Sequence, residues 1–137
     1  MPWRTVDIGN APDASGIYRF SSRSDARGNR RRFVVRYVGQ AKKRRRYTGL
    51  RARVTSNHEH YVNGDKVEVF VIRDPDTRYR RVAPEDRRTS MSKLDYKERM
   101  EIHEQMSTNP RSCSRNNDLN LWRTNWIGAG SIRISRW

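Results

Sequence analysis

Hydrophobic and polar residues alternate in three short segments of the chain, and this pattern predicts β-strands. The first two are residues 17–20 (IYRF) and 32–39 (RFVVRYVG), joined by a polar stretch that contains glycine. β-Branched and aromatic residues on both sides of such a stretch favour a hairpin with a long connection. The third is 66–72 (KVEVFVI), where valines at every second position share one face of a strand.

A first helix is predicted after the second strand. In residues 50–62 (LRARVTSNHEHYV), Leu50, Val54 and Tyr61 are separated by four and seven positions. These spacings place the three side chains on one helical face. The Asn63-Gly64 pair that follows is typical of a helix end, so we expect the helix to stop there.

A second helix is predicted to begin at Ser90 or Ser92 and to run through residues 93–106. Asp95 stands in the capping-box position relative to Ser92. One line of side chains at i, i+4 spacing contains three apolar residues and a carboxylate: Leu94, Glu98, Ile102 and Met106. A carboxylate on an apolar line is costly to bury without a cation, so Glu98 is a candidate functional residue.

The order of these elements predicts one α+β domain with a small, antiparallel, three-stranded sheet flanked by helices. The chain has 137 residues, about the length of one domain. Residues 74–88 are expected to form turns and loop, and the chain after Asn109 to be irregular. Residues 118–137 form a Trp-rich extension, and we expect Trp122 and Trp126 to be packing anchors.

The charge of the chain points to a polyanionic partner. Lys and Arg number 30 against 15 Asp and Glu, a formal net charge of +15, and only 5 of the 30 cations are Lys. Arg carries a planar fork of donors that matches phosphate and stays protonated. Up to His58 there are 15 cations and 3 acids, so +12 of the net charge lies in this part of the chain. Two basic runs, 30–32 and 42–46, flank the second predicted strand.

Several classes of protein are disfavoured by the composition. No segment approaches the roughly 18–20 apolar residues of a membrane span, and the N-terminal residues lack a signal-peptide core. We therefore expect a cytoplasmic protein without a membrane partner, with a secreted toxin domain as the alternative. Cys113 is the single cysteine, which excludes an internal disulfide and a Cys-rich zinc site.

Two tripeptides at the predicted strands carry a specific resemblance. Gly16-Ile17-Tyr18 begins the first strand and Tyr37-Val38-Gly39 ends the second; YVGQAK and then GLRARV follow before the histidines. One tripeptide would be weak, but both in this order and context form a much stronger pattern. Over roughly residues 14–117 the chain resembles the GIY-YIG nucleases, and the resemblance implies their α+β fold.

The resemblance implies that Tyr18 and Tyr37 face one scissile phosphate. One of them would act as the general base and the other would orient the phosphate or water; the sequence leaves open which. Arg53 would bind the non-bridging phosphate oxygens, with Arg51 as the alternative. Because a free tyrosine has a pKa near 10, the base needs a cation nearby to favour its phenolate form.

The resemblance also implies a histidine and a metal ligand. His58 would orient a group or relay a proton, with His60 as the alternative. Glu98 would hold Mg²⁺ or Mn²⁺ largely through water, as magnesium prefers. Glu101 is its alternative, at the family's distance before the proline. The family's asparagine after this helix has three candidates: Asn109, Asn116 and Asn117.

The expected partner is DNA. The residues expected to contact it are the second strand's end, the basic run and the nearby arginine: Gln40, Lys42, Lys43, Arg44, Arg45, Arg46 and Arg51. Any sequence preference must come from loops such as 21–32, 40–48 and 74–90, or from the tail. A toxin domain would also need an acidic immunity protein, and a restriction enzyme that cuts twice would often be a homodimer.

The sequence therefore predicts a metal-dependent endonuclease that hydrolyses DNA phosphodiester bonds. Restriction, repair or mobile-element cleavage, and toxin activity are the settings it allows. The alternative from another class is a basic nucleic-acid-binding module that keeps the fold without chemistry. The presence of both tyrosines favours catalysis.

Overall fold

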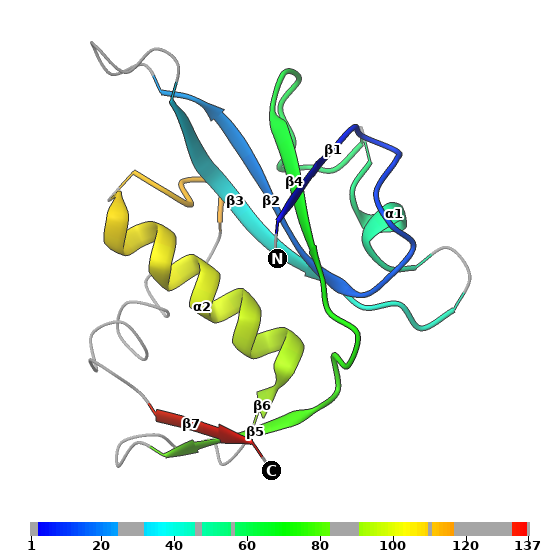
Figure 1. Cartoon of the computed structure of the whole chain (residues 1–137). Helices are drawn as coiled ribbons and strands as arrows, with labels where there is room; N and C mark the ends of the chain where they lie inside the picture. The colour runs from blue at the N-terminus through cyan, green and yellow to red at the C-terminus, as the bar shows by residue number, and fades with distance from the viewer. Residues whose placement is uncertain are drawn as a thin grey trace.

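The structure is a computed structural model that describes residues 3–24, 32–45, 48–55, 57–82, 91–109, 111–116 and 133–136. Within these ranges the chain is α+β, as predicted, with antiparallel sheets, one long helix and one short helix. Figure 1 shows the long helix lying across one side of the main sheet and the short helix on the other side. In the described ranges no helix is long and apolar enough to cross a membrane.

The main sheet has four antiparallel strands in the order β1-β4-β2-β3. The strands are β1 (Arg4–Val6), β2 (Gly16–Arg23), β3 (Phe33–Ala41) and β4 (Lys66–Val71). Strands β2, β3 and β4 confirm the three strands predicted from the alternating pattern. The sequence predicted three strands, and the sheet has a fourth, β1. This strand has only three residues, too few for an alternating pattern, and it is defined by its pairing with β4.

One face of the sheet is covered by the short helix α1 (Leu50–Arg53) and the segment after it. Leu50 and Val54 are buried against Tyr18 and Phe20, as their spacing predicted. The predicted helix over 50–62 is nevertheless wrong, since the helix ends after Arg53. The Thr55 hydroxyl accepts a hydrogen bond from the backbone N–H of residue 57, a local turn that competes with helical bonding.

The opposite face is covered by α2 (Lys93–Thr108), which confirms the second predicted helix. Its N-cap is Ser92, whose hydroxyl accepts from the backbone N–H of Asp95 at 3.1 Å. Leu94 and Ile102 are buried against this face, in contact with apolar side chains of β2 and β3. The helix therefore presents one side to the sheet, and Glu98 lies on that line between two buried residues.

A second antiparallel sheet lies beside the first, with the order β6-β5-β7. It contains β5 (Arg78–Val82), β6 (Met91–Ser92) and β7 (Arg133–Arg136). The prediction of loop throughout 74–88 is wrong at β5, whose sequence RYRRV is too charged to show an apolar alternation. β7 belongs to the extension predicted at 118–137; Trp122, Trp126 and Trp137 lie outside the described residues.

Residues 111–116 run along the edge of β3. The Cys113 N–H donates to the Val35 carbonyl at 2.8 Å, and the Arg115 N–H donates to the Arg36 carbonyl at 2.9 Å. The irregular chain expected after Asn109 thus covers a sheet edge that would otherwise leave backbone groups unpaired.

Candidate active site

Tyr18 lies on β2 at the centre of the site, and its side chain is fully buried. Its neighbour across the sheet is Gly39 on β3. A Cβ atom at position 39 would lie 2.4 Å from both the Oη and Cζ atoms of Tyr18, closer than any real contact. Glycine at this position therefore leaves room for the tyrosine ring to lie across β3. Tyr18, the last residue of the first tripeptide, thus packs directly on Gly39, the last residue of the second.

The first glycine of the motif has an equally direct reason. A Cβ atom at Gly16 would lie 2.2 Å from the Phe70 carbonyl oxygen and 2.9 Å from Leu50 Cδ1. The start of β2 thus passes close to β4 and to the first residue of α1. This close approach holds α1 against the strand that carries Tyr18.

Tyr37 faces the same side of the sheet as Tyr18, because the ladder is regular from the Tyr18–Gly39 pair to the Phe20–Tyr37 pair, and the bulge in β3 begins only beyond Tyr37. Phe20 pairs with Tyr37 but Ser21 pairs with Val35, so Arg36 is an extra residue on β3. Such a bulge bends a strand and redirects its side chains. The Tyr37 and Tyr18 rings lie with centroids 6.0 Å apart, as expected if the two motif tyrosines share a site.

His58 is the histidine that contacts Tyr18. The Tyr18 Oη and His58 Nε2 atoms are 2.8 Å apart, and the His58 Nδ1 atom accepts a hydrogen bond from the backbone N–H of His60 at 3.1 Å. Because Nδ1 is an acceptor, the proton of the neutral ring lies on Nε2. His58 therefore donates to the tyrosine oxygen, which suits orientation of the phenol.

His60, the alternative histidine, plays a different part. Its ring stacks on Tyr37 with centroids 4.4 Å apart and an angle of 18° between the planes. Its carbonyl accepts a hydrogen bond from Arg115 at 3.1 Å. The two candidate histidines thus both contact the tyrosines: His58 is hydrogen-bonded to Tyr18, and His60 is stacked on Tyr37.

Arg53 rather than Arg51 faces the tyrosines. A hydrogen bond from Arg53 acts to lower the pKa of Tyr18, and its charge acts in the same direction on Tyr37. The Arg51 Nε atom instead donates to the Ala11 carbonyl at 2.9 Å. Arg53, the first choice for the phosphate-binding arginine, is therefore the one that lies beside the two tyrosines.

Burial raises the pKa of both tyrosines, and raises that of Tyr18 more strongly. Their mutual hydrogen bond acts in opposite directions: it raises the pKa of Tyr18 and lowers that of Tyr37. A hydrogen bond donated by Tyr18 to the Tyr37 oxygen has this effect, because it stabilises the Tyr37 phenolate. Of the two candidates for general base, Tyr37 loses its proton more readily.

Glu98 approaches the site from α2. Burial first, and then the charge of Asp95, raise its pKa to about 7, while Arg99 and Arg53 oppose the rise. Glu98 in turn raises the pKa of Tyr37, so this carboxylate is within electrostatic reach of both the arginine and the tyrosine. Its position on the apolar line predicted a buried carboxylate; Glu98 is only partly buried, and Glu101 is the buried glutamate of α2.

Glu101, the alternative metal ligand, is committed to another contact. Its Oε1 atom accepts from Arg19 Nη1 at 2.6 Å and from Gln105 Nε2 at 2.8 Å. Arg19 also holds Glu68 through two hydrogen bonds of 3.1 and 3.2 Å. A buried carboxylate in such a network stabilises the packing of α2 on the sheet, and Glu98 is the α2 glutamate whose charge acts on Tyr37.

The donor set fits a hydrated magnesium or manganese ion. Among the described residues no cluster of three His, Cys, Asp or Glu side chains could enclose a metal. Mg²⁺ is commonly held by one or two carboxylates together with waters and substrate phosphates. Glu98 offers one such carboxylate beside a phosphate-binding arginine.

Asn116 is the described candidate asparagine that contacts the second tripeptide. Its side chain bonds both backbone groups of Val38: the Val38 N–H donates to Oδ1 at 3.0 Å, and Nδ2 donates to the Val38 carbonyl at 2.8 Å. Asn109 instead ends α2, and Asn117 lies outside the described residues. The Asn116 side chain thus satisfies the two backbone groups of Val38 that a neighbouring strand would otherwise bond.

A cavity of about 320 Å³ opens beside Arg53 between the end of β3 and α1. Its walls come from both elements and from the start of the basic run: Gln40, Ala41, Lys42, Thr48, Gly49, Ala52 and Arg53. The cavity is large enough for a phosphodiester group, and it joins the predicted catalytic arginine to the residues predicted to contact DNA.

The residues predicted to contact DNA have partners within the chain. Gln40 Nε2 donates to Asp95 at 2.8 Å, and Lys42 and Lys43 form ion pairs with Asp76 and Asp13. Such surface pairs are weak and can exchange for phosphates. Arg44 and Arg45 are exposed; Arg46 lies outside the described residues.

Arg115 is a site residue that the sequence did not reveal. Besides the His60 carbonyl, it binds Asp65, with Nη1–Oδ2 at 2.6 Å and Nη2–Oδ1 at 3.3 Å. The Asp65 side chain is only 2% exposed, so this pair is a firm anchor for the loop that carries both histidines. The partners are 50 residues apart in sequence, and no local pattern signals such a contact.

No family model, curated protein or solved structure matches this chain in the three comparisons made.

Proposed function

We propose that this protein is a metal-dependent endonuclease that hydrolyses DNA phosphodiester bonds in the manner of the GIY-YIG nucleases. The observation that carries the proposal is the convergence of Tyr18, Tyr37, Arg53, His58 and Glu98 on one place. These residues come from two strands, two helices and a loop, and ordinary packing does not require phenols, a guanidinium and a carboxylate together.

Arg53 binds the non-bridging oxygens of the scissile phosphate in this proposal. It lines the 320 Å³ cavity, and its guanidinium is already beside the phenols. A fixed cation aimed at the phosphoryl oxygens stabilises the charge that grows on them in the transition state. The bidentate geometry of arginine suits a phosphate better than lysine would.

Tyr37 acts as the general base and Tyr18 orients it. Tyr18 accepts a hydrogen bond from His58, and its own hydroxyl hydrogen is directed to Tyr37. This chain of bonds lowers the pKa of Tyr37 relative to Tyr18, and an arriving phosphate would draw Arg53 into the same cluster. Tyr37 then removes the proton from the attacking water.

Glu98 would hold Mg²⁺ or Mn²⁺ within electrostatic reach of Arg53 and Tyr37. When bound, the ion lowers the pKa of water and offsets charge on the phosphate. Its charge would also favour the ionised form of Glu98, whose pKa is otherwise raised to about 7 by burial. A single carboxylate suits a site that is completed by the substrate.

The proposed substrate is DNA, because the net charge of +15 and the exposed arginines of the basic run favour a polyanion. The test is cleavage of a supercoiled plasmid with Mg²⁺ by the wild type and by Tyr37→Phe, Arg53→Ala and Glu98→Gln. Arg4→Ala, an exposed cation on β1 at the other edge of the sheet, is the charge-matched control.

Cleavage by the wild type and the control, with loss in the three site variants, is the expected result. Full activity in all three variants would remove the proposed mechanism. DNA binding without scission by any protein or metal would favour the alternative, a basic binding module. That module predicts a salt slope of about −5 if some six phosphates are contacted.

A further inference from the structure

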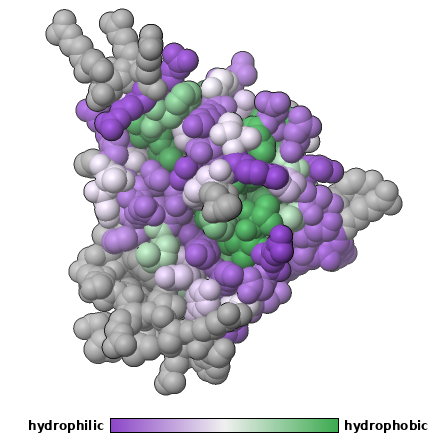
Figure 2. Space-filling view, in the orientation of Figure 1, coloured by the Kyte–Doolittle hydropathy of each residue, from purple (hydrophilic) through white to green (hydrophobic). Residues whose placement is uncertain are grey.

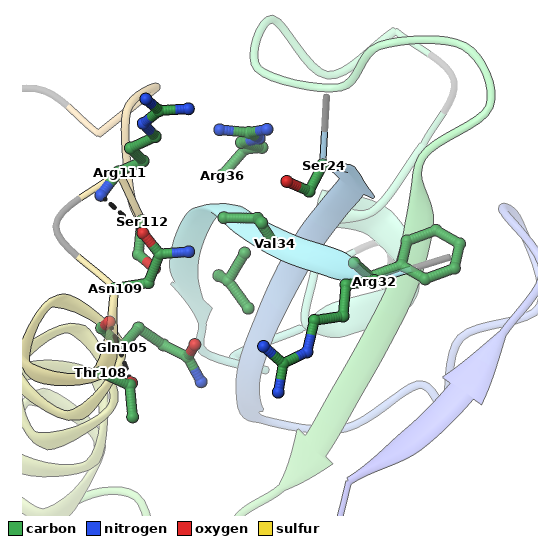
Figure 3. A pocket seen from close by; sticks show the side chains of 11 residues that line it. Ser24, Arg32, Val34, Arg36, Gln105, Thr108, Asn109, Arg111 and Ser112 are labelled. Atoms are coloured by element: carbon green, nitrogen blue, oxygen red, sulfur yellow. Dashed lines mark hydrogen bonds between the residues drawn. The ribbon is translucent and has the colours of Figure 1, made fainter. Parts of the chain in front are cut away.

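A second pocket lies away from the candidate active site, between the start of β3 and the last turns of α2. It has a volume of about 630 Å³. Figure 3 shows its lining side chains, which are Ser24, Arg32, Phe33, Val34, Val35, Arg36, Gln105, Thr108, Asn109, Arg111 and Ser112. The proposed nuclease chemistry uses none of these residues, so the pocket needs its own explanation.

Three guanidinium groups surround this pocket, and no carboxylate is among its described lining residues. In Figure 3 Arg36 and Arg111 lie toward one end and Arg32 toward the other. Arg36 donates one hydrogen bond, from Nε to the Ser22 hydroxyl at 2.8 Å. Cations spread over both ends suit an extended ligand with more than one negative group.

The helix side of the pocket adds neutral donors. The Asn109 side chain uses its oxygen to accept from the Arg111 backbone N–H at 2.9 Å, and its amide nitrogen points toward the pocket in Figure 3. The Gln105 and Thr108 side chains lie on the same side. Amides beside guanidiniums suit a ligand with oxygen acceptors.

An exposed aromatic ring also lines the pocket. Phe33, at the first position of the edge strand β3, is 42% exposed. The Lys66 Nζ atom lies 5.3 Å from the centre of its ring and the Arg23 guanidinium carbon 5.9 Å. Figure 2 shows an apolar patch toward the same end of β2 and β3, set among hydrophilic residues.

We propose that this pocket and the Phe33 ring bind a single-stranded segment of the nucleic-acid substrate. Grooves for single strands combine cations that follow the backbone with aromatic rings on which bases stack. In a duplex the base faces are already stacked, so an exposed phenylalanine among cations favours an unpaired strand. This inference rests on the proposed function only in taking nucleic acid as the substrate.

The position of the pocket relates it to the candidate active site. Phe33 and Tyr37 are four residues apart on β3, about 13 Å at the usual rise of a strand. The bulge at Arg36 places their side chains on opposite faces of β3, which is an edge strand of the main sheet. A strand held at Phe33 would therefore pass around this edge to reach the scissile phosphate within a few nucleotides. The inferred substrate is DNA with an unpaired stretch next to the cut, such as an overhang, a flap or a frayed end.

The experiment measures binding by the full-length protein in EDTA, so that no cleavage occurs. Fluorescence anisotropy is recorded with labelled oligothymidine and with a labelled blunt duplex of the same length. Phe33→Leu removes the stacking surface and Phe33→Tyr, the matched control, keeps it; Arg111→Ala removes a cation, and Arg4→Ala is its control. Melting curves verify that each variant is folded.

We expect Phe33→Leu to weaken oligothymidine binding about fivefold or more and to leave duplex binding unchanged, since stacking is worth about 1 kcal/mol or more per base. Phe33→Tyr should bind like the wild type. Arg111→Ala should reduce the magnitude of the salt slope on the single strand by about 0.7, the value for one lost phosphate contact. Arg4→Ala should leave this slope unchanged.

Equal effects of Phe33→Leu on both nucleic acids, or no effect on oligothymidine, would overturn the proposal, as would equal salt slopes for the two arginine variants.

Side-chain NMR signals of Arg, Asn and Gln give a second, independent measurement of where the ligand binds. They are followed with a thymidine tetranucleotide and with inorganic phosphate as the single-anion probe. Shifts confined to the basic run 42–46 would also refute the pocket. Plasmid cleavage with Mg²⁺ is scored separately, so failure of the pocket and failure of the nuclease proposal are distinguishable.

Discussion

His58 donates a hydrogen bond to the Tyr18 hydroxyl, with 2.8 Å between Nε2 and Oη, because its other ring nitrogen is occupied by the His60 N–H. The tyrosine oxygen thus receives a donor, and the tyrosine's own hydrogen is available to Tyr37. Three side chains from β2, β3 and a loop thus act on one another, and the effect of Tyr18 on Tyr37 lowers the pKa of Tyr37 while the reverse effect raises that of Tyr18. Tyr37 is therefore the better proton acceptor of the two.

The first prediction concerns the pH dependence of stability. Burial, Arg53 and His60 lower the pKa of His58 below its usual 6.5. The neutral ring is favoured in the folded state, so its contribution is fully present above pH 6.5 and is lost as pH falls through the lower folded pKa. Urea unfolding should therefore show that the contribution of His58 to wild-type stability decreases below about pH 6.5, against the opposite trend that Glu98 contributes. His58→Gln, which retains an N–H donor, should reduce this dependence; an identical pH profile would contradict the assignment.

The second prediction separates the two tyrosines. Tyr37→Phe should reduce cleavage by about 10²–10⁴ because it removes the general base, with little change in stability at this partly exposed position. Tyr18→Phe leaves the His58 N–H without its acceptor beside a fully buried ring. It should lower the free energy of unfolding by about 1–3 kcal/mol. Denaturation and single-turnover cleavage of both variants verify this, and a larger stability loss in Tyr37→Phe would reverse the roles.

Periodic patterns predicted the main elements, because β2, β3, β4 and α2 bury one face each and so repeat apolar residues regularly. The same rule failed at 54–62, where a Thr55 side-chain bond starts a turn that apolar spacing does not report. It also missed β1 and β7, whose few residues become strands only by pairing with distant segments.

The candidate site shows the same division. Tyr18, Tyr37 and Glu98 could be selected from tripeptides and from one apolar line, which are local features. The contact that distinguishes Glu101 from Glu98 is made by Arg19, 82 residues from Glu101, whose ion pair engages the Glu101 carboxylate. Contacts between distant segments of this kind have no signature in a single sequence.

The third prediction tests why the second tripeptide ends in glycine. Gly39→Ala places a methyl group 2.4 Å from the Tyr18 ring and should destabilise the fold by about 1–3 kcal/mol, the usual cost of overpacking. In a Tyr18→Leu background the same change should cost much less, because the ring is gone. A double-mutant cycle by urea denaturation measures this coupling; additive losses would show that the strand, and not the ring, requires glycine.

The last prediction uses the raised pKa of Glu98. In the folded state its pKa is about 7 against an ordinary 4.5, so the fold binds a proton that the unfolded chain releases between these values. Stability from this group is present below pH 4.5 and is lost as pH rises to 7. Glu98→Gln, measured in EDTA at pH 8, should therefore unfold less easily by about 1–3 kcal/mol. Its matched control is Glu104→Gln, at an exposed glutamate on the same helix, which should leave the free energy of unfolding unchanged.

Added Mg²⁺ should raise the melting temperature of the wild type and leave that of Glu98→Gln unchanged, because the variant lacks the carboxylate that would bind the ion. Equal stability of the two glutamine variants at pH 8 would mean that the Glu98 carboxylate is well solvated, and a solvated carboxylate has no need of the cation that the nuclease mechanism assigns to it.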